Sequence, residues 1–198
     1  MTAVADGLVR CPWIDESRLS PDDFVLYRDY HDNEWGRPVR DAQALFERIT
    51  LEAFQSGLSW LIILRKRENF RRAFHGFDVE RIARYGERDI ARLLADDGIV
   101  RNRSKIEATI ANARATLDLD VDLAELLWSF APTDRARRRR PKDLSEVPAT
   151  SPESTAMAKE LRRRGFRFVG PTTAYALMQA TGMVDDHTAD CWVPRAAS

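Results

Sequence analysis

The sequence predicts an all-α fold from two observations. Apolar residues recur three or four positions apart, as at Leu45 and Ile49 or at Leu61 and Leu64, which is the spacing that forms one apolar face of a helix. No segment alternates polar and apolar residues for long enough to indicate a strand. The length of 198 residues suits one domain. A chain of this size buries about two thirds of its unfolded surface, so it needs no disulfide to fold.

Start and stop residues mark the ends of the expected helices. Ser20-Pro21-Asp22-Asp23 combines an N-cap, a proline at the first helical position and acidic residues at the positive end of the helix dipole. Ser151-Pro152-Glu153 repeats this start, and glycines follow several apolar runs. The signals predict a helix from residue 20 and further helices over residues 41–57, 59–76, 78–86, 87–98, 102–117, 122–130, 151–165 and 170–182. Residues 132–148, which include Arg135 and the run 137–140, are predicted to form a flexible loop.

Charge is balanced overall but unevenly distributed. Basic and acidic residues number 31 each, whereas residues 135–175 contain eleven basic and four acidic residues. Such a region could contact a polyanion, although a solvated charged face has the same composition.

Cysteine content and hydropathy point to an intracellular protein. Cys11 and Cys191 lie at opposite ends of the chain, and the first residues have no apolar core of signal-peptide length. The longest apolar run, Trp60 to Leu64, is too short to span a membrane. We therefore expect a soluble, cytoplasmic protein without a membrane partner.

Two cysteines and two histidines form a potential metal site. His187 and Cys191 are four residues apart, which would place them on one face of a helical turn. Cys11 and His31 lie near the other end of the chain. Together the four residues are a Cys2His2 set, which is typical of closed structural zinc sites. The alternative is two unrelated buried thiols and two ordinary histidines, because the spacing matches no compact zinc finger.

Glu52 is a candidate functional carboxylate. It falls on the apolar line of Leu45 and Ile49 at helical spacing, so it should lie on or beside the buried face. A buried carboxyl group must be paired, hydrogen-bonded or protonated, and functional acids share this environment. The alternative is a glutamate at the edge of the core that reaches water or an arginine.

Aromatic residues gather in the first third of the chain. The candidates are Trp13, Tyr27, Tyr30, Trp35 and Trp60. Flat side chains with polar tips can stack on a planar ligand such as a nucleobase. Any one of them could equally be a core residue.

The segment 164–173 predicts a tight connection between two helices. Gly165 ends one helix, and Gly170-Pro171-Thr172 begins the next. Free backbone N–H groups at that start form an anion site suited to phosphate, with several arginines nearby. An ordinary corner between helices with surface arginines is the alternative.

With these segments, the sequence resembles the type I 3-methyladenine DNA glycosylases of the helix-hairpin-helix DNA glycosylase superfamily. The resemblance covers nearly the whole chain. It rests on ordered segments at fitting spacing: 30–36 (YHDNEWG), 51–60 (LEAFQSGLSW), 67–70 (RENF), 165–170 (GFRFVG) and Asp186-His187.

The resemblance implies a two-lobed helical bundle with a base pocket between the lobes. It implies one glycosylase domain over residues 11–192, preceded by an extension over 1–10 and followed by a tail over 193–198. By the same match Glu52 faces the flipped base as the catalytic residue, and the five aromatic residues bind the substrate. The match also implies a structural zinc ion bound by Cys11, His31, His187 and Cys191. The hairpin residues expected to bind DNA are Gly165, Arg167, Gly170, Thr172 and Thr173.

The implied activity is that of a monofunctional glycosylase, a monomer that excises 3-methyladenine from double-stranded alkylated DNA. A base alkylated at N3 is cationic and leaves readily, so the site must mainly recognise it. No lysine is marked as a Schiff-base nucleophile, which favours hydrolysis by water. Two rival hypotheses are a non-catalytic nucleic-acid-binding module and a zinc hydrolase, which would need an open coordination position. A third is the same fold acting on another damaged base.

Two positions depart from the family pattern. Asp185 stands where an asparagine is usual, and could stabilise the developing sugar cation or cap a helix; we favour the cap. Ala53-Phe54 replaces smaller or more polar residues beside Glu52 and could reshape the pocket wall.

Overall fold

Helices make up all the regular secondary structure in residues 6–134 and 138–195, the part of the chain that this computed structural model describes. The predicted all-α fold is therefore confirmed, and each expected helix is present. The α-helices are α1 (Pro21–Asn33), α2 (Ala42–Gln55), α3 (Trp60–Ala73), α4 (Val79–Ala83), α5 (Glu87–Ala95), α6 (Arg103–Leu117), α7 (Leu123–Trp128), α8 (Pro152–Arg163) and α9 (Pro171–Ala180). Short 3-10 helices are η1 (Glu16–Arg18), η2 (His75–Phe77) and η3 (Leu144–Glu146).

Helix α2 lies at the centre of the fold. Every residue from Leu45 to Phe54 except Glu47 is buried. The Asp41 carboxylate caps its first turn by accepting a hydrogen bond from the Ala44 N–H at 2.7 Å. A helix that is apolar on nearly all sides needs partners all round, and α2 packs against α3, α6, α7 and α9.

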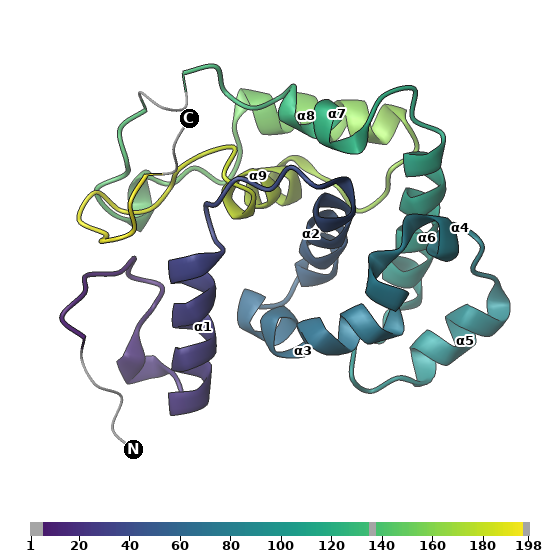
Figure 1. The fold of residues 1–198 in the computed structure, drawn as a ribbon, viewed down its shortest axis with the longest axis horizontal. Helices are drawn as coiled ribbons and strands as arrows, with labels where there is room; N and C mark the ends of the chain where they lie inside the picture. Colours follow the sequence, from purple (N-terminus) through teal and green to yellow (C-terminus); the bar gives the residue numbers. More distant parts are fainter. Residues whose placement is uncertain (1–5, 135–137, 196–198) are drawn as a thin grey trace.

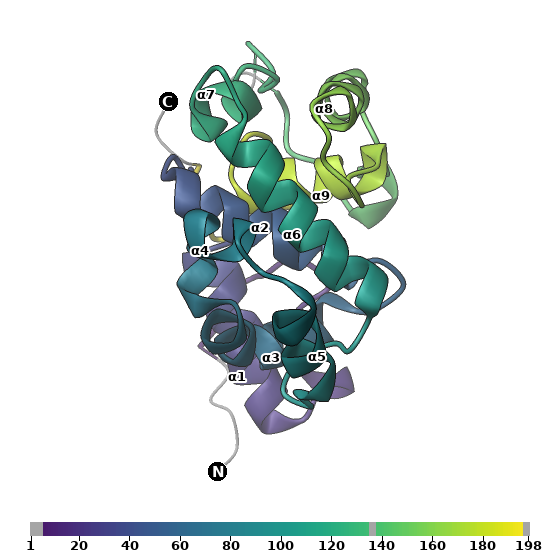
Figure 2. The same cartoon turned by 90° about the vertical axis from the view of Figure 1, so that its right-hand side faces the viewer.

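The helices form two groups with α2 and α6 between them. Helices α3 and α5 lie at one end of the molecule and α7 and α8 at the other (Figures 1 and 2). Helix α2 contacts members of both groups, and one continuous hydrophobic core extends through them. This is the two-lobed arrangement that the resemblance implied.

Segments near the two chain ends lie side by side. The Trp192 N–H donates to the Val9 carbonyl at 2.9 Å, and the Ala189 N–H donates to the Pro141 carbonyl at 2.8 Å. The C-terminal segment, yellow in Figure 1, runs beside η3 and close to the N-terminal segment. The expected domain limits at residues 11 and 192 stay a prediction. No helix within the described residues is both long and apolar enough to cross a bilayer.

The predicted helix cap at Asp185 is wrong. No helix begins there, because residues 183–188 form bends and backbone without regular structure. The Asp185 carboxylate instead accepts hydrogen bonds from the Arg140 Nε at 2.9 and 3.1 Å. Arg140 is buried and also donates to the Val193 carbonyl at 2.8 Å, so this pair ties the C-terminal segment to residues 138–141.

The basic segment that was predicted to be a flexible loop contains the 3-10 helix η3 and several ion pairs. Arg138 pairs with Asp134 and Glu153, and Arg139 pairs with Glu146. Arg135 and Arg137 lie outside the described residues. The described arginines of this run therefore neutralise local carboxylates, which leaves less positive charge for a polyanion than the sequence indicates.

Gly182 sets the turn that returns the chain from α9 to the C-terminal segment. Its φ is +70°, and a Cβ there would lie 2.7 Å from the Gly36 carbonyl oxygen and 2.7 Å from the Arg37 carbonyl carbon. Backbone atoms cannot move aside as a flexible side chain can, so only glycine fits.

Gly182→Ala should lower the free energy of unfolding by at least about 3 kcal/mol. Urea denaturation measures the change. Gly57→Ala is the matched control, because Gly57 also has a positive φ of +82°, but a Cβ added there would meet no described atom within 4 Å. The control should lose only about 1–2 kcal/mol. Equal losses in the two variants would contradict the steric explanation.

Candidate active site and metal centre

A cavity of about 220 Å³ opens between α1, α2, α3 and α9. It is larger than the roughly 150 Å³ cavity that holds a benzene ring in an engineered protein core. All six residues assigned to catalysis or substrate binding from the sequence line it, and six more complete the wall. The lining residues are Trp13, Tyr27, Tyr30, Trp35, Glu52, Gln55, Trp60, Leu144, Val147, Ala176, Gln179 and Asp186.

The aromatic residues form one connected wall. Trp13 makes edge-on contacts with Tyr27 and Trp35, with ring centroids 5.0 and 5.3 Å apart. Tyr30 lies 5.3 Å from Trp60 by the same measure. These ring contacts hold the aromatic side chains in place in the cavity wall. The Trp60 indole nitrogen is buried and has no hydrogen-bond partner among the described residues, so a ligand acceptor could bind it.

Glu52 is the buried carboxyl group of this cavity. It projects from the last turn of α2, is 5% exposed, and forms no hydrogen bond with the described residues. Burial raises its pKa to about 8, against the opposing effect of the Arg48 guanidinium. Burial therefore favours the protonated carboxyl at neutral pH, and a positive charge brought close to it would favour the carboxylate.

Asp186 is a cavity residue that sequence reasoning did not assign. Its carboxylate accepts hydrogen bonds from the Tyr175 hydroxyl at 2.7 Å and from the Gln179 side-chain amide at 2.8 Å. Its position next to His187, a candidate metal ligand, could have identified Asp186 as a site residue from the sequence. Burial and this hydrogen bond raise the pKa of Tyr175, which keeps the hydroxyl a donor. Leu144 and Val147 were also missed, because η3 lies in a segment predicted to be a loop.

The four candidate metal ligands meet in space, and all are buried. Their ligand atoms lie within 4.8 Å of one another. The His187 Nδ1 is 3.5 Å from the sulfur of Cys11 and 3.5 Å from that of Cys191, and the His31 Nε2 is 3.6 Å from the Cys191 sulfur. One detail was wrong: His187 and Cys191 lie in a turn, closed by the Cys191 N–H donating to the Thr188 carbonyl, and not on a helix.

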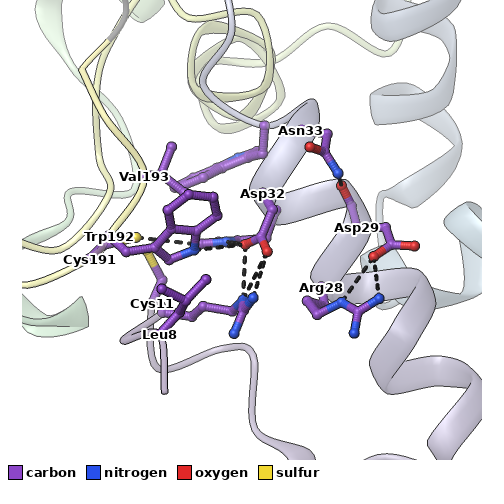
Figure 3. A network of polar contacts seen from close by, with 12 residues as sticks. Leu8, Cys11, Arg28, Asp29, Asp32, Asn33, Cys191, Trp192 and Val193 are labelled. Atoms are coloured by element: carbon purple, nitrogen blue, oxygen red, sulfur yellow. Dashed lines mark hydrogen bonds and ion pairs between the residues drawn. The ribbon is translucent and has the colours of Figure 1, made fainter. Parts of the chain in front are cut away.

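Second hydrogen bonds orient both imidazoles. The His31 Nδ1 donates to the Asp32 carboxylate at 2.7 Å, which leaves Nε2 facing the sulfurs. The same carboxylate accepts from the Trp192 indole at 3.2 Å, as Figure 3 shows, and from the Arg10 Nε at 3.0 Å. The His187 Nε2 donates to the Trp35 carbonyl at 3.2 Å and leaves its Nδ1 free for a metal.

The thiols are placed for metal binding. Contacts with Cys11, His187 and His31 lower the pKa of the Cys191 thiol against the effect of burial. A lowered pKa favours the thiolate, which is the form that binds metals. The Thr188 N–H also donates to the Cys11 sulfur at 3.4 Å.

The segment 30–36 links the cavity to this cluster. Tyr30 and Trp35 line the cavity, while His31 joins the Cys2His2 set. The rings of Trp35 and His187 are 4.7 Å apart, so the cluster supports the aromatic wall from behind. Gly36 is required here, because its φ is +75° and a Cβ would lie 3.0 Å from the His187 Nε2.

The predicted hairpin joins α8 to α9, apart from the cavity lining. Phe166 and Val169 are buried, and Gly165 adopts a φ of +92°. The Asn112 side chain accepts from the Arg167 N–H at 2.7 Å and donates to the Arg167 carbonyl at 3.1 Å, which fixes the hairpin to α6. Gly170 is the N-cap of α9 and offers no side chain to the first N–H groups of that helix.

The arginines around the hairpin are not all available to an anion. Arg163 pairs with Glu160, and Arg164 pairs with Glu160 and Asp120. Gly165, Arg167 and Gly170 lie in the connection, and Thr172 and Thr173 lie in the first turn of α9. The positive charge around them is smaller than the sequence suggests.

Comparison with known proteins matches this architecture to one family. The family model for methyladenine glycosylases matches residues 21–194. DNA-3-methyladenine glycosylase of Haemophilus influenzae and DNA-3-methyladenine glycosylase 1 of Escherichia coli are each 44% identical over 185 residues. These alignments cover 92% of this chain and 96% and 95% of the two relatives.

Solved structures agree with the sequence comparison. A crystal structure of 3-methyladenine DNA glycosylase I superposes with a TM-score of 0.83 at 45% identity, covering 93% of this chain and 98% of the other. The Staphylococcus aureus enzyme, solved to explain 3-methyladenine recognition, gives a TM-score of 0.84 at 31% identity over 95% and 98% of the two chains. The chain belongs to the methyladenine glycosylase family.

Proposed function

We propose that this protein is a DNA glycosylase that removes 3-methyladenine from alkylated DNA as the first step of base excision repair. The supporting observation is a buried carboxyl group, Glu52, inside an aromatic cavity of a size suited to a flat base. The activity named for the relatives at 44% identity supports the same substrate.

The chemistry follows from the charge of the base. An N3-alkylated adenine in DNA is cationic, so when the bond from C1′ to N9 breaks, the electron pair returns to N9 and the base leaves neutral. Water then adds to C1′ and releases a proton, which leaves an abasic site. The base needs little acid assistance, and the protein supplies recognition of the cation.

Glu52 and the aromatic wall recognise that cation. As a carboxylate, Glu52 attracts the positive base and accepts hydrogen bonds from its edge. Aromatic faces of Trp13, Tyr30 and Trp35 add cation–π attraction of roughly 0.5–2 kcal/mol. Neutral purines gain neither interaction in full, so they are rejected. Tyr27 and Trp60 complete the contacts around the base.

Hydrolysis by water is favoured over a lysine nucleophile. No lysine is among the described residues that line the cavity. The buried Lys105 donates instead to the backbone carbonyls of Phe54 and Ser56 at 2.8 and 2.6 Å, where it caps the C-terminal end of α2. A monofunctional reaction without strand cleavage follows.

Glu52→Gln should lower kcat/KM for base release by about 10²–10³-fold, the range typical of losing one preorganised electrostatic group. Chromatography of bases released from methylated duplex DNA measures it. Glu47→Gln is the matched control, because Glu47 lies on the same helix but pairs with Arg71 away from the cavity. Absence of 3-methyladenine release by the wild-type protein would refute the proposed function. Full activity of Glu52→Gln would refute only the residue's role.

The hairpin between α8 and α9 is proposed to be the helix-hairpin-helix element that binds the backbone of double-stranded DNA. The N–H groups of Thr172 and Thr173 lie in the first turn of α9, at the positive end of its dipole. A Cβ at Gly170 would meet no described protein atom within 4 Å, so this face is open to a close approach by phosphate. Gly165 and Arg167 position the hairpin and its charge.

Gly170→Ser should weaken binding of duplex DNA about tenfold, because the new hydroxyl accepts from the same N–H groups and occupies the phosphate position. Stability should be unchanged or higher, since serine is a better N-cap than glycine. Fluorescence anisotropy with duplex DNA measures affinity, and calorimetry with free 3-methyladenine is the control, which should not change. Unaltered DNA affinity would contradict this assignment.

We propose that the Cys2His2 cluster holds a structural zinc ion. Tetrahedral zinc, bound by sulfur at about 2.3 Å and nitrogen at about 2.0 Å, separates these ligand atoms by roughly 3.5 Å. The sulfur–nitrogen distances of 3.5, 3.5 and 3.6 Å fit that geometry. Four protein ligands leave no position for water, which argues against a zinc hydrolase. We also propose that the protein is a monomer, so that all four zinc ligands come from the same chain.

His31→Ala should abolish binding of one zinc per chain and lower the free energy of unfolding by about 3 kcal/mol or more, because zinc binding contributes to folding. Elemental analysis and thermal denaturation measure the two effects. Trp35→Ala is the paired variant: it should retain zinc and mainly lose base release. If the two variants behave alike, the division of labour within residues 30–36 is wrong.

A further inference from the structure

A partly buried charge cluster lies outside the cavity lining, one helical turn from Glu52 on α2. The Glu34 carboxylate accepts from the Arg48 Nη2 at 2.7 Å and from the two terminal nitrogens of Arg67 at 2.6 and 2.8 Å. Two guanidinium groups therefore share one carboxylate, and the cluster carries a net positive charge. None of these three residues lines the cavity.

Arg48 connects this cluster to the cavity. It lies one helical turn before Glu52 on α2, a spacing that places the two side chains on the same face. Its guanidinium lies 5.7 Å from the centroid of the Tyr30 ring, which is itself part of the cavity wall. Arg48 is 8% exposed, and its Nη1 is buried without a hydrogen-bond partner in the described part of the chain.

Arg48 and Glu52 have complementary hydrogen-bonding groups and opposite charges. Among the described residues, the Arg48 Nη1 is a buried donor without an acceptor. Glu52 is 5% exposed, lines the cavity and accepts no hydrogen bond from the described residues. Ionising an isolated buried carboxyl is costly, yet a cationic base is attracted only by the carboxylate. The Arg48 charge opposes the effect of burial on the pKa of Glu52.

We propose that Arg48 is a positioning residue for recognition of the cationic base: together with Glu34 and Arg67 it supplies the buried positive charge that allows Glu52 to be ionised. This inference rests on the proposed function of the cavity. With Glu52 ionised, two arginines balance two glutamates, and the buried group is neutral. The carboxylate then presents its outer side to the cation in the cavity.

Other titratable groups lie near Glu52. Tyr27 and Tyr30 from α1 and Asp186 line the same cavity, and none of them is a cation. Glu34 after α1 and Arg67 from α3 belong to the charge cluster, where Arg67 shares the Glu34 carboxylate with Arg48.

Arg48→Met tests the proposal by removing the charge while keeping an unbranched side chain. NMR of the free protein follows the chemical shift of the Glu52 carboxyl carbon as a function of pH. The signal is assigned by its disappearance in Glu52→Gln. We expect its pKa to rise by about one unit, which at pH 7.5 lowers the ionised fraction about tenfold. kcat/KM for release of 3-methyladenine should fall about tenfold at pH 7.5 and recover toward pH 9, because deprotonation of Glu52 moves to higher pH.

Three further variants separate charge from structure. Arg48→Lys retains the charge and should titrate close to wild type. Arg48→Gln removes the charge but can still donate to Glu34, so it tests the proposal if Arg48→Met fails to fold. Arg71→Met is the control, because Arg71 pairs with Glu47 and Glu68, which do not line the cavity.

An unchanged Glu52 titration in Arg48→Met and Arg48→Gln would overturn the proposal. A loss of activity that is equal at every pH would also overturn it, because that pattern indicates a structural role. The NMR titration needs no turnover, so it tests the coupling even if wild-type protein released no 3-methyladenine and the proposed function failed.

Discussion

The meeting of Cys11 and His31 with His187 and Cys191 joins the two ends of the chain, since His187 follows Cys11 by 176 residues. Closing so long a loop is entropically unfavourable, and the structure compensates with layers of interactions around the four side chains. Asp32 orients His31 and binds Arg10 and Trp192. Because Trp13 and Trp35 pack against the same cluster, the wall of the cavity depends on this closure.

A second constraint acts on the cavity: burying the carboxyl group of Glu52 is energetically costly. A buried carboxyl group on α2 lowers stability when no donor in the protein satisfies it. Glu52 has no hydrogen bond to the described residues, whereas Glu34, only partly buried, has three. This contrast separates the two roles of these glutamates: Glu34 holds α1, α2 and α3 together, and Glu52 stays available to a ligand. A protein that discriminates by charge must keep such a group unsatisfied by its own side chains.

Recognition of the base and contact with DNA are assigned to different parts of the fold. The cavity residues come from α1, α2, α3, α9, η3 and the segments beside them, whereas the hairpin lies just before the start of α9. Helix α9 contributes to both, because Gly170 begins it and Gln179 near its end lines the cavity. A helix between the cavity and the hairpin fixes their separation, so the proposed DNA contact at the hairpin would have one defined position relative to the cavity.

Local sequence signals were sufficient to define the helices, because caps, glycines and apolar spacing act over one or two turns. They also identified the residue types of the metal cluster and of the aromatic wall. They failed at Asp185, where a capping residue precedes no helix and binds Arg140 instead, and at Arg138, which pairs with the distant Glu153. Asp186, Leu144 and Val147 joined the cavity from segments that were not expected to line it. The tertiary structure decided which side chains meet across 176 residues and which buried polar atoms have no hydrogen-bond partner among the described residues. Both depend on packing between distant segments and not on the neighbours of each residue in the chain.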